Sequence, residues 1–261
     1  MPSAPAVTFD LWHTLVYLSP DAESAYMSRL TDAAVRVLEA SPVEPGRTAA
    51  SPSELRESFE RESLRAVNEA HAGRTVTPEQ QLVAAARAAG RAPDPEQYVR
   101  SIEALLAGTD FRVEPSAREV LREVRELGYR VGLVSNTVGE PGRLLRPIIR
   151  RVGLGSYIES YVFSDEHPWA KPAPEIFQEA LRELGSAPER AVHVGDSWPD
   201  IEGARRAGLR AGVLFTGLQS YGTEYRALFA PDDGTLGRAD VTIDRLPDLV
   251  PALARLLPRG R

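Results

Sequence analysis

The chain contains no cysteine among its 261 residues. This absence excludes disulfide bonds, thiolate metal sites and a cysteine nucleophile, and it fits a reducing compartment such as the cytoplasm. No apolar run approaches the ~20 residues that are needed to cross a bilayer. Residues 1–5 also lack the basic and apolar regions of a signal peptide. The sequence therefore predicts a cytoplasmic protein that has no membrane segment.

An excess of positive charge is also missing, because the formal net charge is −6 at pH 7. Without such an excess the chain has no general attraction for phosphate backbones, which argues against nucleic acids and anionic membranes as partners. The length of 261 residues predicts one large domain or a core with an insertion. Nothing in the composition decides between a monomer and a homodimer.

Lysine is nearly absent: Lys171 is the only lysine among 31 basic residues, and all the others are arginine. Lysine carries a compact charge on a flexible stem, so it fits a crowded anionic site that the planar guanidinium of arginine cannot enter. A single lysine in so arginine-rich a chain is therefore a candidate functional residue.

Short β-rich apolar runs alternate with helical patterns over much of the chain. The expected strands are residues 6–9, 130–134, 161–163, 191–194, 211–215 and 240–243. The expected helices between and after them are residues 116–127, 143–152, 174–184, 200–207 and 246–257. This alternation predicts an α/β fold with a mostly parallel sheet that is covered by helices on both faces.

Residues 17–113 break the alternation, because they show helical patterns and no strand pattern. The helices expected there are residues 22–40, 53–70, 77–89 and 94–107, with turn-rich segments between them. An insertion after the first strand would lie above the carboxyl edge of the sheet and act as a lid. The polar loop 217–237 is a second candidate mobile element.

Four loops that follow predicted strands carry the polar residues of interest. They contain Asp10, Ser135, Lys171 and the pair Asp196 and Asp200. In a parallel sheet the carboxyl ends of the strands share one edge, so these loops are expected to converge.

Three carboxylates against one ammonium leave about two negative charges in a partly desolvated place, which favours the entry of a cation. With no cysteine and only four histidines in the chain, oxygen ligands dominate, so Mg²⁺ is the expected ion. A small anionic substrate would share the metal and Lys171, while Ser135 and backbone N–H groups complete a nest the size of a phosphate.

The chain resembles the haloacid dehalogenase (HAD) superfamily in four motifs that occur in the family's order. The first motif is a strand followed by Asp-x-Asp-x-Thr, and this chain matches it in part. The other three motifs are a Ser after a strand, a Lys-Pro before a helix, and Gly-Asp-x-x-x-Asp. The matching residues are Asp10 and Thr14, then Ser135, then Lys171 and Pro172, then Gly195, Asp196 and Asp200. The resemblance implies a Rossmann-like core, residues 1–16 and 114–261, with a helical cap domain at residues 17–113.

The resemblance also implies a hydrolase in which Asp10 attacks the substrate and forms a covalent aspartyl intermediate. Lys171 would orient and neutralise Asp10, and Ser135, Thr14 and Asn136 would contact the substrate together with Lys171. Mg²⁺ would be bound by Asp10, Asp196, Asp200 and the backbone carbonyl of Trp12.

Trp12 is the clearest departure from the family pattern. Phosphatases of the family have an acidic general acid/base two residues after the nucleophile, and tryptophan cannot transfer a proton. General acid–base assistance is usually worth ~10²–10⁴ in rate, so the loss matters most for poor leaving groups. His13 or His167 would be a substitute proton donor, although we interpret His13 as a turn residue that faces away. His193 is interpreted as a strand residue and not as a ligand.

Three functions fit this pattern. The first, which we favour because Asp196 and Asp200 keep the carboxylates that call for a cation, is a Mg²⁺-dependent phosphatase that acts on a small phosphate monoester through an aspartyl phosphate. The second is a metal-independent 2-haloacid dehalogenase, because that branch also has an aromatic residue at the position of Trp12. The third is a HAD fold kept as a binding protein. The Schiff-base branch that cleaves phosphonates is excluded, because residues 17–113 contain no lysine. The substrate itself cannot be read from the core motifs.

Overall fold

The computed structural model describes residues 4–221 and 238–258, so most of the predicted loop 217–237 lies outside the described residues. Within them, six parallel strands form one sheet in the order β5-β4-β1-β6-β7-β8. The strands are β1 (Ala6–Phe9), β4 (Arg130–Ser135), β5 (Ser160–Phe163), β6 (Ala191–Gly195), β7 (Ala211–Phe215) and β8 (Val241–Ile243). The parallel α/β fold predicted from the sequence is confirmed.

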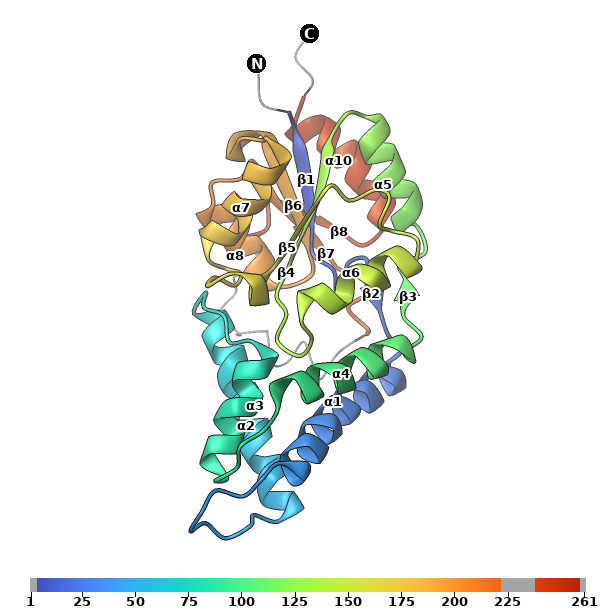
Figure 1. The fold of residues 1–261 in the computed structure, drawn as a ribbon. Coiled ribbons are helices and arrows are strands. Elements are labelled where there is room, and N and C mark those ends of the chain that lie inside the picture. The colour runs from blue at the N-terminus through green and yellow to red at the C-terminus, as the bar shows by residue number, and fades with distance from the viewer. Residues whose placement is uncertain (1–3, 222–237, 259–261) are drawn as a thin grey trace.

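Helices cover both faces of this sheet (Figure 1). On one face lie α5 (Ala117–Glu126), α6 (Gly142–Arg151) and α10 (Leu249–Leu256), with the 3₁₀ turn η4 (Leu246–Asp248) leading into α10. On the other lie α7 (Pro174–Leu184) and α8 (Trp198–Arg206), and two further 3₁₀ turns, η1 (Ser164–Glu166) and η2 (Pro188–Arg190), occur in loops. Alternate residues of a strand serve opposite faces: Phe163 of β5 packs on the α5 side, while its neighbour Val162 packs on the α7 side.

Four helices form a separate layer at the carboxyl end of the sheet (Figure 1). They are α1 (Pro20–Ala40), α2 (Pro52–His71), α3 (Pro78–Ala88) and α4 (Pro95–Ala107). Each begins with proline, whose missing N–H costs nothing in the first helical turn. Ser51 and Thr77 complete capping boxes with Glu54 and Gln80. These local signals explain why the helices predicted in this interval are found within one or two residues.

The expectation of no strand between residues 17 and 113 is wrong at its two ends. The strands β2 (Val16–Tyr17) and β3 (Arg112–Val113) pair in antiparallel fashion where the chain leaves and re-enters the core. A strand of two residues has no readable alternation, which is why the sequence pattern missed it.

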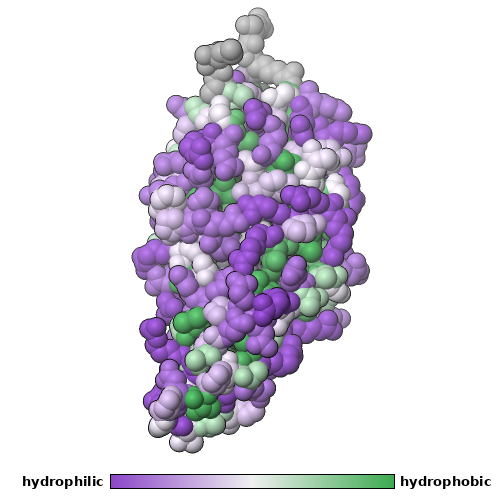
Figure 2. Space-filling model, viewed as in Figure 1, coloured by the Kyte–Doolittle hydropathy of each residue, from purple (hydrophilic) through white to green (hydrophobic). Residues whose placement is uncertain are grey.

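The surface seen in Figure 2 is mostly hydrophilic, with separate apolar patches. The apolar side chains are largely buried, and the main cluster extends from the sheet into the helices α1 to α4. No helix within the described residues is both long enough and apolar enough to cross a membrane.

Candidate active site

The strand order brings the predicted site residues to one edge. Strand β1 pairs with β4 on one side and with β6 on the other, so the carboxyl ends of these three strands are adjacent. Asp10 follows β1, Ser135 ends β4, and Asp196 follows β6. The N–H of Asp10 donates to the Val194 carbonyl at 2.9 Å, which extends the pairing of β1 with β6 into the loop.

Lys171 joins two of the three aspartates. Its Nζ donates to Asp10 Oδ1 at 2.6 Å and to Asp200 Oδ1 at 2.7 Å. All three side chains are buried, with exposed side-chain fractions of 4% for Lys171, 9% for Asp10 and 0% for Asp200. Such short, charge-assisted hydrogen bonds are the strong kind, and they fix the position of the Asp10 carboxylate.

Asp200 accepts four hydrogen bonds with its two oxygens. Oδ1 receives Lys171 and lies 2.9 Å from His193 Nε2, while Oδ2 receives the N–H of Ser197 at 3.1 Å and its hydroxyl at 2.6 Å. A carboxylate has about four acceptor positions, so a metal bound directly to Asp200 would have to replace one of these donors. A Cβ at Gly195 would lie 2.2 Å from the Asp200 Cγ, which explains the glycine in this motif.

His193 belongs to this buried hydrogen-bond network, which the sequence did not reveal. It lies in β6 as predicted, but its side chain is fully buried and connects Asp200 to Thr8 of β1, whose Oγ1 is 2.9 Å from Nδ1. Thr8 and His193 are register partners across β1 and β6. The only hint in the sequence is a polar residue at the same point of two otherwise apolar strands. Because an ionised carboxylate can only accept, Nε2–H is the donor to Asp200.

The pKa values of these groups follow from burial and mutual charge. Burial would raise the pKa of Asp200, but the charge of Lys171 and the hydrogen bonds from His193 and Lys171 outweigh it, and the pKa is lowered. The pKa of Asp10 is raised, because burial and the charge of Asp200 exceed the effect of Lys171. Burial lowers the pKa of Lys171, yet the two carboxylates raise it overall, so this lysine carries its charge at neutral pH.

The three aspartates also form a group that could hold a metal ion. One oxygen from each of Asp10, Asp196 and Asp200 lies within 4.8 Å of the others, and all three residues are buried. These hard oxygen atoms fit Mg²⁺ and not a softer metal.

The predicted substrate-contacting residues behave differently from one another. The hydroxyls of Ser135 and Thr14 are both buried, and neither has a hydrogen-bond partner within the described residues. Asn136 instead uses its amide on Lys171, because its Oδ1 accepts from the Lys171 N–H at 2.7 Å and its Nδ2 donates to the Lys171 carbonyl at 3.0 Å. The Asn136 side chain therefore positions the lysine, and its predicted contact with substrate stays a prediction.

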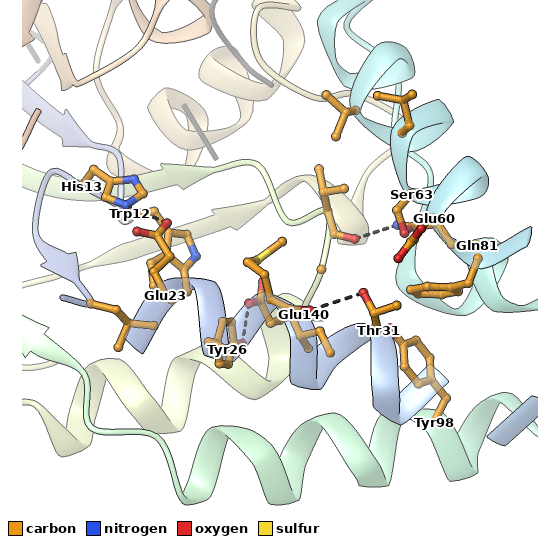
Figure 3. A pocket seen from close by; sticks show the side chains of 18 residues that line it. Trp12, His13, Glu23, Tyr26, Thr31, Glu60, Ser63, Gln81, Tyr98 and Glu140 are labelled. Atoms are coloured by element: carbon orange, nitrogen blue, oxygen red, sulfur yellow. Dashed lines mark hydrogen bonds and ion pairs between the residues drawn. The ribbon is translucent and has the colours of Figure 1, made fainter. Parts of the chain in front are cut away.

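Trp12 and His13 point toward the helical layer (Figure 3). The Trp12 ring packs near Tyr26 of α1 and edge-on against Phe111, with centroid distances of 6.3 and 5.6 Å. His13 lies in a turn, as we interpreted it, and its side chain is buried against the helical layer. Its Nε2 lies 3.1 Å from Glu23 Oε1 of α1, and its φ of 56° places the backbone in the left-handed region. A non-glycine residue in that region is held there by its surroundings, and the His13 N–H donates to the Val16 carbonyl at 2.8 Å.

His167, the other predicted proton donor, stacks on the partly exposed ring of Trp169 at a centroid distance of 6.3 Å. Its part in proton transfer stays a prediction.

Known proteins resemble this chain in sequence and in fold. A glyceraldehyde 3-phosphate phosphatase of Methanothermobacter thermautotrophicus is 38% identical over 104 residues, which are 39% of this chain and 44% of that protein. Pyrophosphatase PpaX of Bacillus cereus is 29% identical over 136 residues, which are 52% of this chain and 57% of that protein. The chain thus matches only about half the length of these curated relatives.

Among solved structures, a 2-haloacid dehalogenase from Pseudomonas syringae pv. Tomato DC3000 superposes with a TM-score of 0.65 at 26% identity. The superposition covers 97% of this chain and 99% of that one. Residues 4–208 match the family described as haloacid dehalogenase-like hydrolase, which is most of the chain. The protein therefore belongs to the haloacid dehalogenase-like hydrolases.

Proposed function

We propose that this hydrolase is a Mg²⁺-dependent phosphatase that cleaves a small phosphate monoester through an aspartyl phosphate on Asp10. The observation that carries the proposal is the placement of Lys171 Nζ, 2.6 Å from Asp10 Oδ1 and 2.7 Å from Asp200 Oδ1. One ammonium thereby holds an ionised carboxylate in place. The Ser135 hydroxyl, which has no partner among the described residues, stands at the end of the neighbouring strand β4. The names of the relatives, a glyceraldehyde 3-phosphate phosphatase and a pyrophosphatase, support the hydrolysis of a phosphate compound.

In the first step the Asp10 carboxylate attacks phosphorus, a carboxylate–phosphorus bond forms, and the bond to the organic oxygen breaks, so that this oxygen leaves as an alkoxide or aryloxide and takes its proton from water. The Ser135 hydroxyl and the Lys171 ammonium hydrogen-bond the oxygens of the transferring group, where negative charge develops. Water then cleaves the aspartyl phosphate, which releases phosphate and restores the Asp10 carboxylate. Asp200, His193 and Asn136 act through Lys171, because each fixes its side chain or its backbone.

Asp10, Asp196 and the backbone carbonyl of Trp12 would hold Mg²⁺, with Asp200 beside them. When bound, the ion would neutralise charge on the phosphate oxygens and orient the group for in-line attack. Residues 17–113 would act as a cap domain that closes the site from the carboxyl end of the sheet. The reaction suits a cytoplasmic enzyme with a small anionic substrate.

A 2-haloacid dehalogenase is the second candidate, because Trp12 is aromatic where that branch is aromatic and the dehalogenase from P. syringae superposes over nearly the whole chain. A halide leaves without a proton, so the loss of the acid at Trp12 would not matter there. The buried aspartate cluster favours the phosphatase, since three carboxylates against one lysine call for a cation.

The test is a parallel assay of small aryl phosphates and 2-chloro acids, each with Mg²⁺ and with EDTA. We expect phosphate release that requires Mg²⁺ and is lost in Asp10→Asn. Full activity of Asp10→Asn, or activity unaffected by EDTA, would refute the mechanism. Metal-independent release of chloride would select the dehalogenase.

A further inference from the structure

A pocket of about 310 Å³ lies between the helical layer and the loops of the active site (Figure 3). Trp12 and His13 form part of its wall, and they follow Asp10 by only two and three residues. Residues Val138 to Glu140 form another part, in the loop that begins after Ser135. The two loops that carry the nucleophile and the phosphate-binding hydroxyl therefore also enclose this pocket.

Most of the pocket wall is apolar. Aromatic rings from both layers contribute, including Trp12 from the core and Phe59 and Tyr98 from α2 and α4. Aliphatic side chains such as Leu30 and Val67 fill the space between them. Among the described residues that line it there is no arginine and no lysine.

The charged groups at the wall are carboxylates with partners of their own. Glu23 lies 3.1 Å from His13, and Glu140 accepts from the Tyr26 hydroxyl at 2.5 Å. Glu60 lies 3.7 Å from Arg56 of the same helix, and 55% of its side chain is exposed. The one basic side chain at the wall among the described residues is His13, and its Nε2 already lies against Glu23, so the wall offers an anionic ligand no free cation. An anionic ligand group buried here would lose its hydration without gaining a counter-charge, which is strongly unfavourable.

We propose that this pocket binds the organic part of the substrate, and that this part is apolar, uncharged and about the size of a two-ring aromatic group. The proposal rests on the function proposed above, since the phosphate is placed at Asp10, Ser135 and Lys171. The size follows from the volume: a cavity of about 150 Å³ accommodates benzene, and this pocket is roughly twice as large. Esters that carry a carboxylate or a second phosphate on the organic part are poor substrates.

The first test compares kcat/KM for phenyl phosphate, 2-naphthyl phosphate and 6-carboxy-2-naphthyl phosphate in the presence of Mg²⁺. The second ring should lower KM about tenfold, because it removes more apolar surface from water. The carboxylate should reduce kcat/KM by about tenfold or more relative to the plain naphthyl ester. Equal values for phenyl and naphthyl esters, or a preference for the carboxylated ester, would overturn the proposal.

A matched pair of variants on α2 tests whether the missing positive charge causes this selectivity. Glu60 lines the pocket, whereas Glu57 is exposed on the same helix and does not. Glu60→Arg should reduce the discrimination against the carboxylated ester about tenfold, and Glu57→Arg should retain the discrimination of the unmodified protein. If the two substitutions had identical effects, the discrimination against the carboxylated ester would not come from the charge of the pocket.

Binding measurements separate this proposal from the proposed function. Quenching of tryptophan fluorescence reports the binding of 2-naphthol and of 6-carboxy-2-naphthol without any turnover, because Trp12 lies in the wall. We expect 2-naphthol to bind more tightly by about tenfold, and Glu60→Arg to reduce this difference. If this preference holds while no phosphate ester is hydrolysed, the phosphatase proposal fails and the pocket assignment stands. If esters are hydrolysed but the two naphthols bind equally, the pocket assignment fails.

Discussion

His193 Nε2 lies 2.9 Å from Asp200 Oδ1, and neither side chain has any exposed surface. This contact is one of a series of hydrogen bonds that connects Thr8 to His193, Asp200, Lys171 and finally Asp10. A chain of buried hydrogen bonds therefore connects the middle of the sheet to the nucleophile. It fixes the lysine in a place where an unpaired charge would be very costly.

Replacing His193 tests whether this chain supports catalysis. His193→Phe keeps a ring beside Phe177 but removes both nitrogens, so Asp200 loses a donor and holds Lys171 less firmly. We expect kcat to fall about 10- to 100-fold with little change in KM, as is typical when a supporting partner of a site is lost. Steady-state kinetics on an aryl phosphate measures this split.

The control is Phe177→Leu, which disturbs the same packing contact without touching Asp200. It should lower the free energy of unfolding and leave kcat nearly unchanged. An equal loss of kcat in both variants would mean that His193 serves only the packing of the core.

Lys171 should not tolerate arginine. The site is closed around it, with 3% of the residue exposed, so a larger planar guanidinium cannot donate to Asp10 and Asp200 from the same place. We expect Lys171→Arg to lower kcat by about 10²–10³-fold, the usual cost of losing one stabilising donor at the reacting group. A variant with half or more of the original kcat would argue against the role of Lys171 as the counter-charge of Asp10.

Lys171→Met should also destabilise the fold by about 3–5 kcal/mol, because it leaves two buried carboxylates without their ammonium. Arg143→Met is the matched control. Arg143 pairs with Glu79 at 3.0 Å, but 49% of its side chain is exposed, and such surface pairs contribute about 1 kcal/mol or less. Urea denaturation measures both values, and similar losses in the two variants would contradict the importance of the buried pairs.

Much of the fold could be predicted because its signals are local. Strands β1 and β7 and helix α7 occur with the predicted bounds, since apolar runs, prolines at helix starts and glycines at helix ends mark them in the sequence. The convergence of Asp10, Ser135 and Asp196 was also predictable, because it follows from parallel strands alone. The ribbon β2–β3 was not, since two residues are too few to show a period.

The contacts that the sequence did not reveal depend on tertiary geometry. The pairing of Thr8 with His193 requires β1 to lie beside β6, and these residues are 185 positions apart. The two hydrogen bonds between the Asn136 side chain and the Lys171 backbone require the loops after β4 and β5 to lie next to each other. The direction of Trp12 and His13 depends on α1, a helix in another layer of the molecule.

Glu140 should make stability depend on pH. Burial raises its pKa to about 7 from a usual value of 4.5. A group whose pKa is raised by folding adds to the free energy of unfolding. This stabilisation is complete below the unfolded-state pKa and is lost as the pH rises through the folded-state pKa. Between pH 4.5 and 8 the protein should therefore lose about 3 kcal/mol of stability through this group.

Glu140→Gln removes this titration and keeps an oxygen that accepts from Tyr26. The variant should be more stable than the unmodified protein at pH 8, and the difference should shrink as the pH is lowered to 5. Glu60→Gln, at an exposed position, should show no such trend. Thermal unfolding across this pH range tests the expectation, and parallel curves for Glu140→Gln and the unmodified protein would contradict it.

Trp12→Asp tests whether the missing acid limits the reaction. The carboxylic acid form of an aspartate at this position could donate its proton to the departing oxygen, which is worth about 10²–10⁴ in rate where the leaving group is poor. We expect the ratio of kcat for an alkyl phosphate to kcat for an aryl phosphate to rise about 10²-fold. The same change removes the partly buried ring that packs near Tyr26 and Phe111, so it should also lower the stability of the fold. Trp12→Leu separates the two effects, because it also loses the ring but gains no acid. If both variants change the ratio equally, the cause is the altered pocket and not the restored proton donor.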